Sequence, residues 1–158
     1  MYLYHGSNVV VKNPEIRQSN RALDFGTGFY LTSNFDQAKK WADVITLRRG
    51  EGTAFVSSYL FNENETMNLN CLTFLEPNED WLKFVVAFRT GKNIDVDYDL
   101  IIGPVANDNT MPVINMFING DYSVDEAIKR LKTQKLSNQY VFKTEKSLTL
   151  LSFEKVLT

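Results

Sequence analysis

Cysteine and histidine are almost absent from this sequence. Each occurs once among the 158 residues, as Cys71 and His5. A single cysteine cannot form an internal disulfide, and one histidine, one cysteine and scattered acids give none of the ligand spacings of metal sites. We therefore expect no metal. We also expect Cys71 to be a small buried side chain in a protein of a reducing compartment.

Long apolar runs and an excess of one charge are also missing. No apolar run reaches the roughly 18 residues that a membrane helix requires, and residues 1–5 have neither the basic start nor the apolar stretch of a signal peptide. Seventeen basic and nineteen acidic residues give a net charge of −2. The composition therefore offers no overall attraction for nucleic acid. These absences predict a cytoplasmic protein with no membrane partner.

The signatures of several enzyme classes are absent as well. There is no Walker-type phosphate loop, and Gly26-x-Gly28 lacks the third glycine of a dinucleotide fingerprint. No Gly-x-Ser-x-Gly sequence occurs, which argues against a serine hydrolase of that type. Asp24-Phe25-Gly26 has the letters of the kinase magnesium motif, but the glycine-rich and catalytic loops of a kinase are missing. We therefore reject these functions.

The composition is that of one globular domain spanning residues 1–158, with 44% hydrophobic and 23% charged residues. Residue patterns predict strands at 2–4, 29–32, 53–61, 68–74, 98–102, 140–142 and 151–153. They predict helices at 33–49, 77–91, 111–118, 123–135 and 144–150. Because strands and helices do not alternate regularly, we expect an α+β fold and not a doubly wound parallel sheet.

The chain is organised around the stretch Asp24-Phe25-Gly26-Thr27-Gly28-Phe29-Tyr30-Leu31-Thr32. The Gly-x-Gly step lets the backbone pass where a side chain would block it, and the ring of Tyr30 can then line a surface for a flat ligand. A helix with Ser33 as its N-cap follows, and Trp41 lies on its apolar face. A tight turn feeding an ordinary strand, with Trp41 in the core, is the alternative interpretation.

A second place of interest is His5-Gly6-Ser7, where the first predicted strand ends. Gly6 leaves room for backbone N–H and C=O groups to reach the amide of a ligand. A histidine near a terminus can also be a surface residue or a satisfied hydrogen-bonding group, so both interpretations stay open.

Three motifs occur in an order that resembles the ADP-ribosyltransferase superfamily, in the branch of diphtheria toxin and the poly(ADP-ribose) polymerases. They are Leu3-Tyr4-His5-Gly6-Ser7, Gly26-Thr27-Gly28-Phe29-Tyr30-Leu31 and Asn138-Gln139-Tyr140-Val141, with Trp41 at the spacing of the second stacking aromatic. The chain also resembles a bacterial family of small proteins placed in that superfamily. The resemblance implies a split mixed or antiparallel sheet with flanking helices.

The resemblance also implies a mono-ADP-ribosyltransferase with NAD as co-substrate. Nicotinamide would lie between Tyr30 and Trp41, and His5 would hydrogen-bond the ribose on the adenosine side. The Gly6 backbone would hold the carboxamide with help from Ser7, and Gly28 would let the chain pass the ligand. ADP-ribose would go to an unknown protein or nucleic-acid acceptor, with release of nicotinamide. Such a protein would be a toxin-like or regulatory modifier, with a neutralising partner protein as one expectation.

The sequence departs from that family at Gln139, which stands where the family has its catalytic glutamate. An amide can accept a hydrogen bond, but it carries no charge and is no base. Three alternatives follow: Gln139 positions the substrate, Asp108 or Glu145 supplies the charge, or the domain is a catalytically silent module that binds NAD or ADP-ribose. Ser137 stands two residues before Gln139, so the signature of arginine-modifying enzymes is absent.

Overall fold

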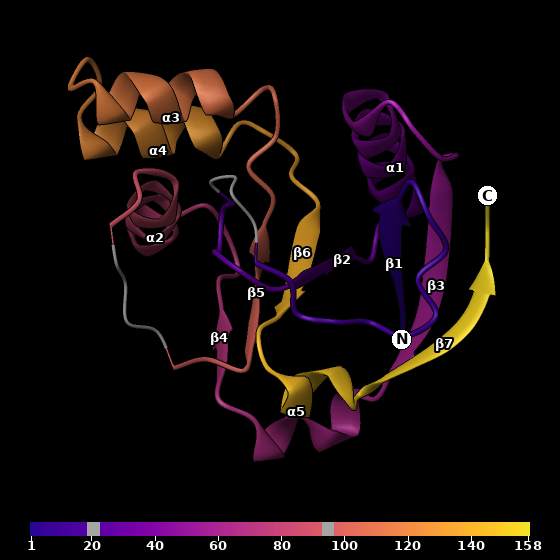
Figure 1. The fold of residues 1–158 in the computed structure, drawn as a ribbon. Coiled ribbons are helices and arrows are strands. Elements are labelled where there is room, and N and C mark those ends of the chain that lie inside the picture. The colour runs from indigo at the N-terminus through magenta and orange to yellow at the C-terminus, as the bar shows by residue number, and fades with distance from the viewer. Residues whose placement is uncertain (19–22, 93–96) are drawn as a thin grey trace.

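A computed structural model describes residues 1–18, 23–92 and 97–158 (Figure 1). Its strands are β1 (Tyr2–Ser7), β2 (Phe29–Thr32), β3 (Phe55–Phe61), β4 (Cys71–Thr73), β5 (Leu100–Pro104), β6 (Asn138–Phe142) and β7 (Leu151–Val156). Its helices are α1 (Phe35–Arg49), α2 (Glu79–Arg89), α3 (Met111–Ile118), α4 (Val124–Leu131) and α5 (Glu145–Leu148), with a 3₁₀ helix, η1 (Glu63–Asn68). None of the helices in the described part of the chain is long and apolar enough to cross a membrane.

All seven strands belong to one sheet, in the order β4-β5-β6-β2-β1-β3-β7. β4 and β5 are parallel, and every other neighbouring pair is antiparallel. The sheet is therefore mixed, and strands do not alternate regularly with helices along the chain. This confirms the predicted α+β class.

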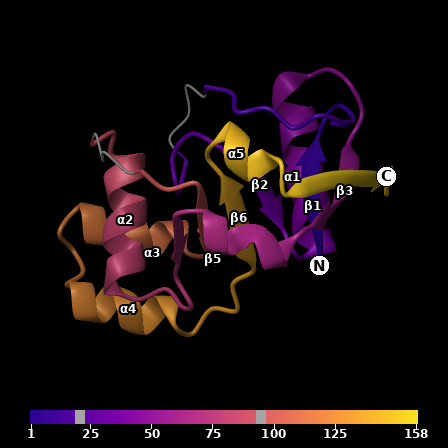
Figure 2. The ribbon, with the colours of Figure 1, turned by 90° about the horizontal axis from the view of Figure 1, so that it is seen from below.

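The long helices cover one face of the sheet, in two groups. α1 packs on β1 and β3 at one end, and α2, α3 and α4 pack together at the end with β5 and β6 (Figures 1 and 2). The strand register places Tyr4, Thr32, Gln139 and Gly103 opposite one another across four strands, so the side chains of Tyr4, Thr32 and Gln139 share this face. The stretch of sheet between the two helix groups is formed by β2 and β6.

The sheet opens between β1 and β2. The two strands pair only at Tyr4 and Thr32, although β1 continues beside β3 as far as Ser7. Over the same length β2 pairs with β6 from Phe29 to Thr32. If the antiparallel pairing of Tyr4 with Thr32 continued, Gly6 would lie opposite Tyr30 and Ser7 opposite Phe29. The two halves of the sheet therefore separate beside these residues.

Several predicted details are wrong. Asn34, not Ser33, is the N-cap of α1, and its side chain accepts a hydrogen bond from the Gln37 N–H. Cys71 is exposed because β4 is a three-residue strand at the edge of the sheet. The predicted strand at 68–74 shrinks to the three residues of β4, and its first residue, Asn68, is the last of η1. Other predicted element ends also differ: for example, α4 stops at Leu131, β7 continues to Val156 and β1 continues to Ser7.

Candidate functional site

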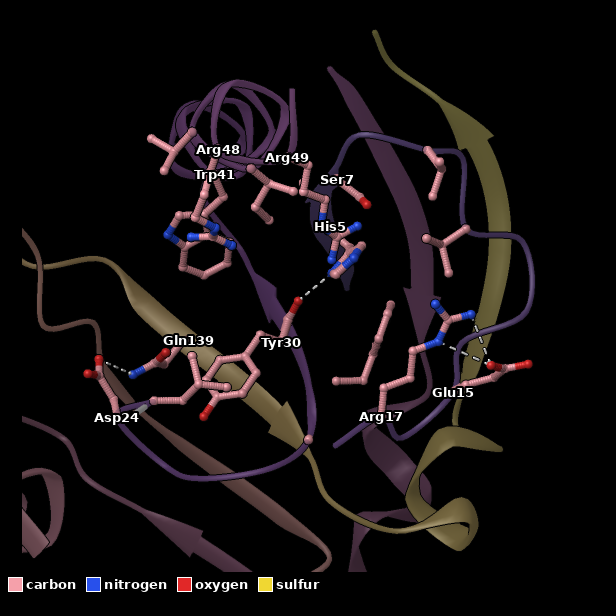
Figure 3. A pocket seen from close by; sticks show the side chains of 18 of the residues that line it. His5, Ser7, Glu15, Arg17, Asp24, Tyr30, Trp41, Arg48, Arg49 and Gln139 are labelled. Atoms are coloured by element: carbon pink, nitrogen blue, oxygen red, sulfur yellow. Dashed lines mark hydrogen bonds and ion pairs between the residues drawn. The ribbon is translucent and has the colours of Figure 1, made fainter. Parts of the chain in front are cut away.

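A cavity of about 790 Å³ lies at the opening of the sheet, beneath α1 (Figure 3). It is lined by residues of β1, β2, α1, α2 and β6 and by the loops after β1 and β5. The lining includes all seven residues that the sequence motifs single out: His5, Gly6, Ser7, Gly28, Tyr30, Trp41 and Gln139. Its volume falls in the range of small-molecule sites, roughly 300–1,000 Å³.

His5 lies where β1 leaves β2. Its Nδ1 is 2.7 Å from the carbonyl oxygen of Tyr30, and because a carbonyl only accepts, Nδ1 carries the hydrogen and Nε2 is the acceptor of the ring. The imidazole stacks on Phe29 with ring centroids 4.3 Å apart. Burial lowers the pKa of His5 to about 4, and Arg49 contributes in the same direction, against the bond to Tyr30. His5 is therefore neutral near pH 7 and offers Nε2 to a hydroxyl group.

Tyr30 presents its ring to the cavity while its hydroxyl is occupied elsewhere. The hydroxyl donates to the Gly26 carbonyl at 2.5 Å and accepts from the Phe25 N–H at 3.2 Å. Burial raises the pKa of this hydroxyl well above its ordinary value. Since the hydroxyl closes the turn before β2, the part of Tyr30 that is open to the cavity is the face of its ring.

The turn before β2 is held by a lysine that sequence analysis missed. Gly26 has a φ of 77°, and a Cβ there would lie 2.5 Å from a ring carbon of Phe88, so glycine is required. Lys143 Nζ donates to the carbonyl oxygens of Phe25 at 2.6 Å and Thr27 at 2.8 Å. Burial lowers the pKa of Lys143 to about 8. Lys143 therefore fixes the backbone that carries Tyr30.

Trp41 reaches the cavity because α1 lies unusually close to β1. A Cβ at Gly6 would lie 2.0 Å from the Ala38 carbonyl oxygen and 2.7 Å from the Ala42 nitrogen. Backbone thus meets backbone, which only glycine permits. Ala38 and Ala42 are buried in this contact, whereas Trp41 remains half-buried on the cavity wall. Gly6 therefore has a packing role as well as a place in the cavity lining.

Gln139 belongs to a buried polar network (Figure 3). It is 2% exposed, and its Nε2 donates to Asp24 Oδ2 at 3.1 Å and to the Pro104 carbonyl at 3.3 Å. Asp24 Oδ1 accepts from Arg89, with Nε at 2.7 Å and Nη2 at 2.5 Å. Asp24 Oδ2 also accepts from the Ala106 N–H at 2.9 Å. The Asp24 carboxylate therefore accepts four hydrogen bonds: two from Arg89, one from the Ala106 N–H and one from the Gln139 amide.

The carboxylate bonded to Gln139 in this cavity is Asp24 and neither of the two predicted candidates. Asp108 is exposed on the loop after β5, and Glu145 is exposed in α5; neither lines the cavity. The loop after β5 nevertheless matters, because Pro104 and Ala106 supply the backbone groups that hold Gln139 and Asp24. Its role could not be derived from the sequence.

Comparison with known proteins places the chain in a family. A family model described as "Protein of unknown function (DUF3990)" matches residues 1–153. The chain belongs to this family. The match covers every residue that lines the cavity. No curated protein and no solved structure matches the chain.

Positive charge gathers at the cavity of this DUF3990 protein. Among the residues that the structure describes, five basic side chains line it against two acidic ones, although acidic residues outnumber basic ones in the whole chain. The basic residues are Lys12, Arg17, Arg48, Arg49 and Arg89. Arg89 is paired with Asp24, Arg17 with Glu15, and Arg49 donates to Asn8 at 2.7 Å. The cavity therefore suits an anionic ligand.

In the described part of this DUF3990 chain, no group of three or more His, Cys, Asp or Glu side chains is placed to hold a metal ion. The functional residues that sequence analysis missed are Asp24, Arg89 and Lys143. Asp24 belongs to the central stretch 24–32 and to the letters of a kinase motif, but neither pattern predicts its contacts with Arg89 and Gln139. No local signal marks Arg89 or Lys143, because their partners are distant in sequence.

Proposed function

We propose that this protein is an NAD-dependent mono-ADP-ribosyltransferase, which transfers ADP-ribose to a macromolecular acceptor and releases nicotinamide. One observation carries the proposal. Three motifs from separate parts of the chain, with Trp41, resemble those of the ADP-ribosyltransferases, and their seven candidate residues line a single cavity. Sequence spacing alone does not require this, since β1, β2, α1 and β6 all have to contribute to one site.

In this proposal the nicotinamide ring of NAD lies between Tyr30 and Trp41. A flat cationic ring gains from aromatic faces, and the bonds of the Tyr30 hydroxyl hold its ring in place before the ligand arrives. On β1, the edge turned toward β2 is unpaired beyond Tyr4 among the described residues. Backbone groups of that edge near Gly6, with the Ser7 hydroxyl, are those that would hold the carboxamide.

The ribose and the pyrophosphate of NAD also have suitable partners in the cavity lining. The neutral Nε2 of His5 accepts a hydrogen bond from a ribose hydroxyl. The pyrophosphate carries two negative charges, which suit a cavity lined by more basic than acidic residues. The ligand is thus recognised at three chemically different points, which fixes its orientation along the opening of the sheet.

The reaction breaks one bond and forms one. The bond between C1′ of the ribose and the nicotinamide nitrogen breaks, and its electron pair stays on that nitrogen, which loses its positive charge. A lone pair of the acceptor forms the new bond to C1′, and the acceptor's proton passes to solvent. Gln139 lies beside the ribose and accepts a hydrogen bond from its hydroxyl, an interaction that strengthens as positive charge develops on the sugar.

The proposal extends to the acceptor, the compartment and a partner protein. We propose a protein or nucleic-acid acceptor that approaches from the open side of the cavity. We also propose that the protein acts in the bacterial cytoplasm, where an exposed free thiol such as Cys71 stays reduced. A toxin-like activity there would need a neutralising partner protein.

Thermal unfolding with increasing NAD tests the binding step. Ligand at about a hundred times its Kd adds about 2.7 kcal/mol to stability, which raises Tm by roughly 5–10 °C in a domain of this size. We expect Trp41→Ala to lose most of this shift. Leu47→Ala on the same helix, at an 85% exposed position outside the cavity lining, should keep it. An equal shift in both variants, or none in wild type at millimolar NAD, contradicts the proposal.

A further inference from the structure

The surroundings of Gln139 are built for an amide and not for a carboxylate. Both neighbours of Nε2, Asp24 Oδ2 and the Pro104 carbonyl, are acceptors. The Pro104 carbonyl also accepts from Trp81 Nε1 at 3.0 Å, so its position is fixed. These acceptors decide the orientation of the amide, because only its nitrogen can face them. The remaining polar atom, Oε1, is then the one left to the cavity that Gln139 lines.

Asp24 cannot itself serve a substrate. Its two oxygens accept from Arg89, the Ala106 N–H and Gln139, and it is 5% exposed. A carboxylate whose two oxygens each accept two hydrogen bonds has no lone pair left for a ribose hydroxyl. Asp24 can therefore influence the reacting atoms only through its hydrogen bond with the Gln139 amide.

We propose that the negative charge lost at position 139 now resides on Asp24 and acts on the substrate through the Gln139 amide. Asp24 is thus a positioning residue, and Gln139 is the catalytic residue that touches the ribose. The hydrogen bond from Nε2 to a carboxylate draws electron density toward Oε1, since linked hydrogen bonds polarise one another. Oε1 then stabilises the positive charge that develops at C1′. This inference rests on the proposed function.

The pH dependence of Gln139→Glu distinguishes this arrangement from a simple loss of the catalytic glutamate. When protonated, the introduced carboxyl group copies the amide, because its O–H donates to Asp24 and its C=O faces the cavity. When ionised, it puts two carboxylates about 3 Å apart, which cannot both hold a charge easily. We therefore expect the kcat for nicotinamide release, relative to wild type at each pH, to fall about tenfold or more as pH rises from about 5.5 to about 8.5. If the missing charge at 139 limits the reaction, kcat rises instead, and the inference is overturned.

Taking the ratio of variant to wild-type kcat at each pH removes the effects of other charged groups near Asp24 and residue 139. Arg89 from α2 faces Asp24, the Tyr30 hydroxyl from β2 lies at the same turn, and Lys143 from the end of β6 holds that turn. His5 from β1 has a pKa of about 4. Further charged residues of the cavity lining are Lys12, Glu15, Arg17, Arg48 and Arg49. All of these groups are present in wild type and variant, so their effects cancel in the ratio.

A second set of variants separates charge from folding. Asp24→Asn should lower kcat by about 10–100-fold and change the calorimetric Kd for NAD by less than about threefold. The matched control is Asp99→Asn, because Asp99 also accepts from a backbone N–H, that of Asn70, and from Thr144, but lies outside the cavity lining. It should keep kcat.

Three outcomes are decisive. An Asp24→Asn variant that keeps its kcat, while wild type turns NAD over, overturns this inference alone. A wild type that neither binds NAD nor releases nicotinamide overturns the proposed function and this inference with it. If Asp24→Asn does not fold, the sign of the Gln139→Glu pH profile still decides.

Discussion

The only histidine of the chain makes its protonation measurable through stability. The pKa of His5 is about 4 in the folded protein against about 6.5 in an unfolded chain. The folded state thus binds fewer protons in this range, so His5 contributes stability that is fully present above about pH 6.5 and is lost as pH falls toward 4. At about pH 5 the two pKa values correspond to a loss of about 2 kcal/mol relative to neutral pH.

Urea unfolding of wild type and His5→Asn at about pH 7.5 and pH 5 measures this loss. The asparagine amide keeps a donor near the position of Nδ1 for the Tyr30 carbonyl, yet it does not titrate. Because carboxylates are common to both proteins, their effects cancel. We expect wild type to lose about 2 kcal/mol more than the variant. Equal losses in the two proteins would refute the burial of a neutral imidazole at the sheet opening.

Three further substitutions test how the cavity is built. Tyr30→Phe leaves two backbone groups of the Gly26 turn without their partner and should lower the free energy of unfolding by about 1–3 kcal/mol; an unchanged value in urea means the turn does not depend on the hydroxyl. Gly6→Ala sets a Cβ against the Ala38 carbonyl and should cost about 4 kcal/mol or more, so a soluble variant with wild-type Tm argues against the close packing of α1. Lys143→Met should weaken NAD binding measured by calorimetry about tenfold through a looser turn; unchanged affinity would show that Lys143 is dispensable there.

Residues with a local signal were predictable from the sequence. His5, Tyr30 and Gln139 each lie on a short strand with recognisable neighbours, and Trp41 follows at helical spacing. The fold class also follows from local patterns, because element type depends mainly on periodicity and turn residues. Ser33 was predicted as the N-cap where Asn34 holds that place, since both residue types cap helices well and adjacent positions compete.

Contacts between distant segments were not predictable. Asp24 joins Gln139 across 115 positions and Arg89 across 65, and Lys143 reaches Phe25 across 118. No periodicity encodes such pairs, because they depend on the order of strands in the sheet. The same reason explains Cys71, whose exposure follows from β4 being an edge strand. The sequence therefore indicated seven residues that line the cavity, but not the contacts that hold them in place.

Release of nicotinamide from NAD by the purified protein is the sharpest test of the proposed reaction. We expect wild-type protein to release nicotinamide over many turnovers, and Tyr30→Ala to release it at least about a hundredfold more slowly. NAD that raises Tm without any release would instead identify a catalytically silent binding module of the same fold. No release and no change of Tm at millimolar NAD would contradict an NAD site in this cavity altogether.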